Sequence, residues 1–118
     1  MCIDLLLKQL SSLDNHNKET VQTDETATDL MTLAPASFLQ DLQTFYFDVF
    51  QFSKTVGRER QMRIMAIGLL SVNNIQVDEA RFLNFVSAIQ GRYMTQVAYH
   101  NDLHASDCAQ HVSFLLNQ

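Results

Sequence analysis

The residues best suited to chemistry lie near the C-terminal end of this 118-residue chain, where three of its four histidines fall within twelve positions. On a helix, positions i, i+4, i+7, i+8 and i+11 share one face, and here they hold His100, His104, Asp107, Cys108 and His111. Histidines one turn apart can direct their rings into one pocket, a spacing typical of helical metal sites. An aspartate one turn further along can hydrogen-bond a histidine's second ring nitrogen and fix its tautomer.

The same spacing also has a structural interpretation. A His-x-x-x-His pattern often arises by chance as a solvated or capping pair. A catalytic zinc usually takes three protein ligands, whereas the spacing supplies two. Cys108 is expected to be a small buried thiol rather than a reactive one, and His111 to be structural or exposed. The spacing alone therefore predicts a candidate site.

Helices are the elements expected to position this segment. Three glycines, one proline and the lack of an alternating strand pattern argue against a turn-rich β fold. The aromatic run 45–52 is too dense for one helix face, which predicts a helix end or bend there. Gly57 is expected to end the element that precedes it. Further helices are expected over 58–70, after an N-cap at Asp78, and over 100–116. The predicted fold class is all-α, a compact multi-helix domain.

The composition divides the chain into three parts. Residues 1–13 carry leucines and an isoleucine at helical spacing and are expected to form an amphipathic helix, which docks on its own domain or makes a partner or dimer contact. Residues 14–36 are polar, acidic and threonine-rich, and are interpreted as a linker. The helical domain is expected over residues 37–118, after the composition changes at Pro35.

Charge and cysteine usage exclude several classes of protein. Eight basic and thirteen acidic residues give a net charge of −5, which has the wrong sign for binding nucleic acid. No apolar run approaches the roughly 18 residues of a membrane span, and the N-terminus lacks the basic region of a secretory signal. Cys2 and Cys108 are too few for a disulfide framework, so a cytoplasmic location is expected.

The residue identities around the histidines add a family resemblance. The run Tyr-His-Asn-x-x-His-Ala-x-Asp at 99–107 resembles the first signature of the class I 3′,5′-cyclic-nucleotide phosphodiesterase catalytic domain. Phe-Asp-Val-Phe at 47–50 and Phe-Leu-Asn-Phe at 82–85 are similar to upstream segments of that domain. The lead-in Val-Ala-Tyr-His-Asn at 97–101 resembles the cAMP-specific, dunce-like branch. The resemblance covers about residues 37–117.

This resemblance implies an all-helical signal-transduction hydrolase that converts a 3′,5′-cyclic nucleotide, with cAMP the expected substrate, to the 5′-monophosphate. In the family, two divalent metals, zinc and magnesium, hold the attacking hydroxide. His100 matches the histidine that protonates the departing O3′, His104 a ligand of the tighter metal, and Tyr99 a residue of the substrate pocket. Asp107 is assigned the role of orienting a histidine ring. The alternative is that Asp107 is a helix-surface or capping carboxylate.

The sequence also departs from the family pattern. Ser106 and Cys108 stand where the family usually has alanine and valine. The remaining metal ligands of the family, a His-Asp pair and a distant aspartate, and its purine-binding glutamine lie downstream of the first signature, and none is found before Gln118. We therefore expect the N-terminal portion of a catalytic domain, with one ligand of the two-metal site and no activity by itself.

Two other functions remain open. A phosphodiesterase-like helical unit could serve as a non-catalytic structural or interaction subunit. Alternatively, an unrelated helical protein could bind a metal through His100, His104 and Asp107, in which case these 118 residues alone would hold stoichiometric zinc.

Overall fold

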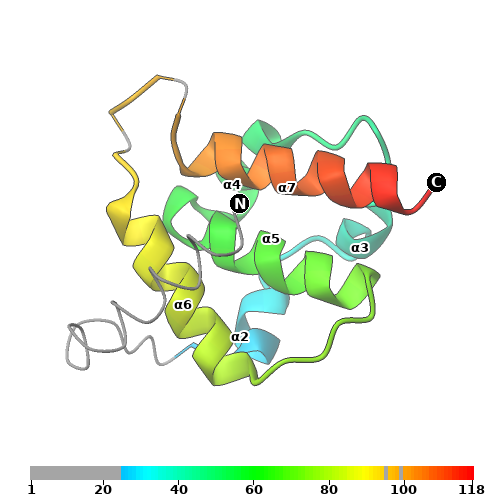
Figure 1. The fold of residues 1–118 in the computed structure, drawn as a ribbon, viewed down its shortest axis with the longest axis horizontal. Coiled ribbons are helices and arrows are strands. Elements are labelled where there is room, and N and C mark those ends of the chain that lie inside the picture. Colours follow the sequence, from blue (N-terminus) through cyan, green and yellow to red (C-terminus); the bar gives the residue numbers. More distant parts are fainter. Residues whose placement is uncertain (1–24, 95, 99) are drawn as a thin grey trace.

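The computed structural model describes residues 25–94, 96–98 and 100–118, and the predicted all-α fold class is confirmed over this part of the chain (Figure 1). The predicted helix at 1–13 lies outside the described residues, as do residues 14–24 of the predicted linker. The described elements are α2 (Ala27–Met31), α3 (Phe38–Asp41), α4 (Val49–Val56), α5 (Arg58–Val72), α6 (Glu79–Arg92) and α7 (Asp102–Leu116). None of these helices is long and apolar enough to cross a membrane.

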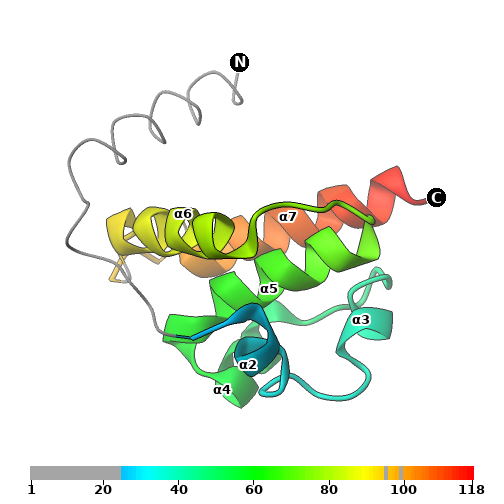
Figure 2. The same cartoon turned by 90° about the horizontal axis from the view of Figure 1, so that it is seen from below.

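Helix α5 forms the centre of the fold. It contacts α2, α3, α4, α6 and α7. Seen from below, α5 lies between α6 and α7 on one face and the short helices α2 and α3 on the other (Figure 2). Ile64 and Met65 of α5 are buried in a core that includes Leu30 and Leu42. The helix that carries His104 and directly follows His100, α7, is therefore fixed by packing against the centre of the domain.

One glycine lets α3 approach α5 closely. A Cβ atom added at Gly68 would lie 2.6 Å from a ring carbon of Phe38 and 2.7 Å from a methyl carbon of Leu42. Phe38 and Leu42 are both buried, and the Phe38 ring stacks on Phe52 with centroids 4.6 Å apart and planes 10° apart. The absence of a side chain at Gly68 is thus what admits this aromatic layer into the core.

Local signals place the helix boundaries largely as predicted. The aromatic run is interrupted between α3 and α4, where Asp48 caps α4 by accepting hydrogen bonds from the backbone N–H groups of Phe50 and Gln51. Gly57 has a φ of 97°, a conformation that favours glycine, and separates α4 from α5. Asp78 caps α6 by accepting a hydrogen bond from the backbone of Arg81.

The predicted linker differs from the structure at its C-terminal end. Residues 27–31 form α2, whose N-cap Thr26 makes a reciprocal capping box with Asp29. Leu30 is fully buried in the core, and Glu25 pairs with Arg60 at 3.0 Å. The low apolar content of this segment did not predict a helix. One fully buried leucine and one N-cap are enough to stabilise the helix, because the rest of the domain supplies the packing.

Candidate functional site

The candidate site lies at the N-terminal end of α7. The last helix begins at Asp102 rather than at the predicted His100, because Asn101 adopts an extended conformation and serves as the N-cap. The Asn101 Oδ1 accepts a hydrogen bond from the backbone N–H of His104 at 3.1 Å. Its Nδ2 donates to the carbonyl of Val97 at 2.9 Å. This asparagine therefore joins the incoming loop to the first turn of the helix.

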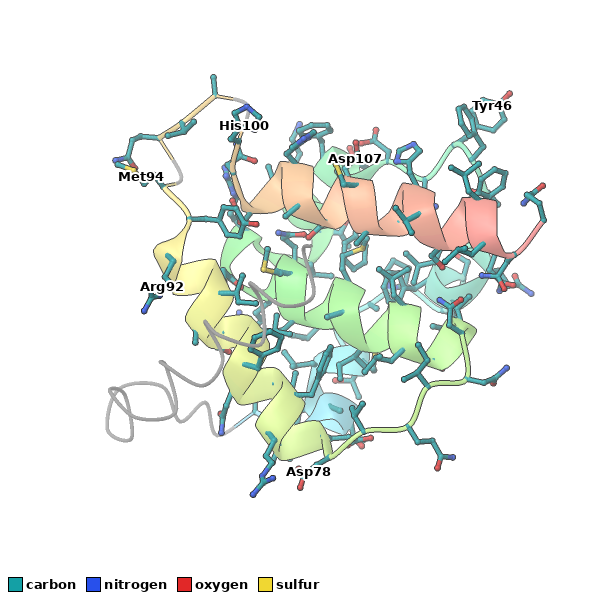
Figure 3. All side chains as sticks on the ribbon, viewed as in Figure 1. Tyr46, Asp78, Arg92, Met94, His100 and Asp107 are labelled. Carbon is teal, nitrogen blue, oxygen red and sulfur yellow. The ribbon has the colours of Figure 1, made fainter. Side chains whose placement is uncertain are left out.

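The structure brings two of the predicted residues together. The ring centroids of His100 and His104 are 5.9 Å apart, with the planes inclined at 78°. His100 is exposed and His104 is half-buried. Because His100 precedes the helix, the two rings approach from a loop and a helix rather than from two turns of one helix face. Figure 3 shows His100 at the loop end of α7, with Asp107 further along the helix.

Cys108 lies beside His104, one turn along α7. Its Sγ is 3.5 Å from the His104 Nε2. The thiol is exposed, so the expectation of a buried cysteine is wrong. The reason is the orientation of α7, which buries the opposite side of the helix, with Ser106 and Gln110 among the buried residues. A histidine nitrogen and a cysteine sulfur are both ligands of soft divalent metals.

Asp107 pairs with His111, one turn further along the helix. The His111 Nδ1 lies 3.4 Å from the Asp107 Oδ1 and 2.8 Å from the Asp107 carbonyl oxygen. The half-buried His111 ring also packs edge-on against Phe45, with centroids 5.8 Å apart. These contacts give His111 a structural role, one of the two alternatives predicted for it. They give Asp107 a histidine partner, although His111 had no assigned role in the site.

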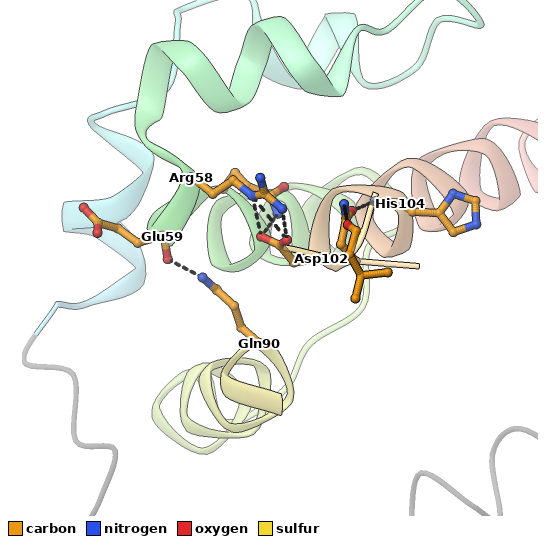
Figure 4. A network of polar contacts seen from close by, with 8 residues as sticks. Arg58, Glu59, Gln90, Asp102 and His104 are labelled. Atoms are coloured by element: carbon orange, nitrogen blue, oxygen red, sulfur yellow. Dashed lines mark hydrogen bonds and ion pairs between the residues drawn. The ribbon is translucent and has the colours of Figure 1, made fainter. Parts of the chain in front are cut away.

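A partly buried ion pair that was not predicted from the sequence supports the first turn of α7. The Asp102 carboxylate is 1% exposed and accepts hydrogen bonds from the Arg58 Nη2 at 2.6 Å and Nε at 3.2 Å (Figure 4). The Gln61 Nε2 donates to the second carboxylate oxygen at 3.4 Å. Burial raises the pKa of Asp102, but the hydrogen bonds and charge of Arg58 outweigh it and leave that pKa below its usual value.

No local signal identifies this pair. Asp102 occupies the first helical position, where an acidic side chain is ordinarily a solvated partner of the helix dipole. Its cationic partner is 44 residues away, at the start of α5. The pair fixes the N-terminal end of α7 against the central helix, and so fixes the backbone that carries His104.

The described residues do not form a metal centre by themselves. Among residues 25–94, 96–98 and 100–118, no group of three or more histidine, cysteine, aspartate or glutamate side chains is placed to hold a metal ion. His104 and Cys108 supply at most a pair of neighbouring donors. Tyr99, predicted to line the substrate pocket, lies outside the described residues. The residues present thus do not fit a two-metal site without further ligands.

Comparisons with protein families, curated proteins and solved structures find no match to this chain.

Proposed function

We propose that this chain is the N-terminal portion of a cyclic-nucleotide phosphodiesterase catalytic domain, with cAMP as the expected substrate. The observation that carries the proposal is the approach of the His100 and His104 rings to 5.9 Å within a sequence that resembles the family's first signature. In this proposal His100 donates a proton to the departing O3′ of the nucleotide. His100 is exposed, and histidine is the side chain most often used for general acid catalysis.

The supporting contacts explain how the two histidines would be positioned. The backbone N–H of His104 is bonded to Asn101, which immediately follows His100. The Arg58–Asp102 ion pair holds the same turn against α5. His104 is therefore fixed in the first turn of α7, and His100 directly precedes the N-cap of that helix. Proton transfer to one defined oxygen requires groups that are positioned in this way relative to each other.

The proposal assigns His104 as one ligand of a divalent metal and assigns the other ligands to residues beyond these 118. When bound, the zinc and magnesium ions of such a domain would supply the hydroxide that attacks phosphorus. Because no complete ligand set occurs among the described residues, the 118-residue chain alone is expected to hydrolyse no cyclic nucleotide. Measurable metal-dependent turnover by this chain would contradict that assignment.

Three histidine variants test the roles in the native polypeptide that carries this sequence. His100→Ala should retain bound metal and lose cAMP hydrolysis by about 10²–10⁴-fold, the usual contribution of a general acid. His104→Ala should lose metal as well as turnover. His111→Ala is the matched control on the same helix and should retain both, because its contacts are with Asp107 and Phe45. Full activity in the His100 and His104 variants would refute the assigned roles.

A non-catalytic structural or interaction subunit is the second candidate. It is favoured by exposed apolar side chains on α7, where Val112, Leu115 and Leu116 are 56%, 68% and 77% exposed. The intact mass of the native polypeptide, isolated from its source cells, discriminates the two candidates. A much heavier species that contains a downstream His-Asp pair would support the enzyme. A species near 13.5 kDa without cyclic-nucleotide hydrolysis would support the subunit.

A further inference from the structure

An exposed apolar stripe runs along the C-terminal half of α7, on the side of the helix that faces away from the core. Val112, Leu115 and Leu116 are each more than half exposed, and the exposed Cys108 lies one turn before Val112. Residues 108–118 include no lysine, arginine, aspartate or glutamate. We propose that this stripe is the interface of a symmetric dimer between two copies of the chain.

Two aromatic side chains from the loop between α3 and α4 extend the stripe. The Phe45 ring packs edge-on against Phe114 of α7 and against Tyr46, with centroids 5.7 Å and 5.5 Å apart. Phe45 is 55% exposed and Tyr46 is 90% exposed, and Figure 3 shows Tyr46 projecting away from the body of the domain. The stripe and these two side chains thus form one apolar surface, the α7 patch, which comprises Phe45, Tyr46, Cys108, Val112, Leu115 and Leu116.

The area of the α7 patch matches the apolar part of one half of a dimer interface. Its side chains expose about 500 Å², because a whole aromatic side chain presents about 150–250 Å² and an aliphatic one somewhat less. Each partner in a stable interface buries about 800 Å². Of this area about 56–65% is apolar, which again corresponds to about 500 Å². Apolar patches of this size on a protein surface are often functional.

The absence of charge from the α7 patch favours a second copy as the occupant. The chain has a net charge of −5, so two copies repel each other on average. Within residues 108–118 no acidic side chain opposes the approach of a second copy, and the neighbouring Asp107 lies beside the His111 ring. Such a surface offers no ion pair to a charged partner, whereas two identical uncharged surfaces can meet without repulsion.

The spacing of the stripe also suits twofold symmetry, in which the same surface of each copy meets itself. An axis perpendicular to α7 near Val112 makes the two α7 helices antiparallel. It places Cys108 of one copy opposite the leucine pair of the other, because these residues lie on either side of Val112 along the helix. The short cysteine side chain then faces the longer leucine side chains, so that the two helices can pack closely along the stripe.

The first experiment measures the mass of the 118-residue chain by sedimentation equilibrium over a series of concentrations. We expect a reversible dimer with twice the mass of one 13.5 kDa chain. Leu115→Glu should raise the dissociation constant at least tenfold, because it would bury a carboxylate in the interface. Met94→Glu is the matched control, since Met94 is 57% exposed in the loop after α6, far from Tyr46 in Figure 3. A monomer at every concentration, or equal weakening by both variants, would refute the interface.

Disulfide crosslinking tests the position of the axis. In a chain whose two native cysteines are replaced by serine, Val112→Cys should form a disulfide-linked dimer when oxidised glutathione is added. A disulfide requires Cα atoms within about 7 Å of each other, which a residue beside the axis satisfies. Met94→Cys in the same background should form at least tenfold less of the linked dimer. Equal crosslinking at the two positions would indicate random collision and overturn the proposed axis.

Residues 1–13, which also carry apolar side chains at helical spacing, are the alternative source of self-association. Leu6→Glu should leave the dissociation constant unchanged if the α7 patch is the interface. A dimer that is lost in Leu6→Glu but kept in Leu115→Glu would form through residues 1–13 and would contradict the proposal. The inference is independent of the proposed phosphodiesterase function, since none of its tests uses a nucleotide or a metal.

Discussion

Replacement of Arg58 by leucine tests how strongly one partly buried ion pair holds the start of α7. The substitution removes three contacts to the Asp102 carboxylate, two from the Arg58 Nε at 3.2 Å and 3.3 Å and one from the Nη2 at 2.6 Å. It leaves a carboxylate that is 1% exposed with the hydrogen bond from Gln61. Loss of one partner from a buried ion pair costs about 3–5 kcal/mol. Because the Arg58 side chain is 40% exposed, water can reach the vacated position, and we expect about 3 kcal/mol, the lower end of that range.

The assay is urea unfolding followed by far-UV circular dichroism, because the chain contains no tryptophan to report by fluorescence. A loss of about 3 kcal/mol corresponds to a fall in Tm of about 10 °C for a domain of this size. Arg60→Leu is the matched control: its partner Glu25 lies 3.0 Å away, but the two side chains are 38% and 34% exposed. An exposed pair of this kind contributes at most about 1 kcal/mol.

The pH dependence gives a second test of the same pair. In the native chain the pKa of Asp102 is lowered, so the pair's contribution is present above about pH 4 and is lost as the pH falls through that lowered pKa. In the Arg58→Leu variant, burial is no longer opposed by the arginine and raises the pKa of Asp102. Protonation of Asp102 on acidification then removes the free-energy cost of a buried, unpaired charge. The difference in unfolding free energy should therefore be smaller at pH 4 than at pH 7. A pH-independent difference, or one no larger than that of Arg60→Leu, would refute the reasoning.

Two further substitutions test the packing and the cap described above. Gly68→Ala should lower the unfolding free energy by about 1–3 kcal/mol, because the new Cβ would meet the buried Phe38 and Leu42 side chains. Alanine in an open helix would instead raise the stability, so a gain in unfolding free energy would contradict this packing. Asn101→Ala should cost about 1 kcal/mol and shift the NMR signals of His104, whereas Asn101→Asp should preserve stability, since both asparagine and aspartate cap helices well.

Features that depend on neighbouring residues were predictable from the sequence. Gly57 and Asp78 mark helix ends through their own backbone conformation or side-chain oxygen, so their roles were correctly predicted. The rings of His100 and His104 do lie close together, but not on one helix face as the spacing predicted, because His100 lies in the loop before α7. The boundary of α7 was misplaced by two residues because Asn101, read only as part of a family signature, is the cap.

The side of α7 that faces the core could not be predicted from its apolar pattern. Its buried residues include Asp102, Ser106 and Gln110, whereas Val112 and Leu115 are exposed. A rule that places apolar side chains in the core therefore assigns the faces of α7 incorrectly. The same rule predicts the wrong exposure for Cys108, which lies beside His104. Asp102 and Gln110 are buried with hydrogen-bond partners that are distant in sequence, and such partners leave no local pattern.

The side chain of Gln110 links two regions that are far apart in the sequence. Although only 1% exposed, it donates hydrogen bonds from its Nε2 to the carbonyl oxygens of Leu42 and Thr44, at 2.9 Å and 2.8 Å. The loop after α3 thus satisfies two of its backbone carbonyl groups only after a helix more than sixty residues later has docked, which places its ordering late in folding. The loop and α7 should then open as one cooperative unit in hydrogen exchange.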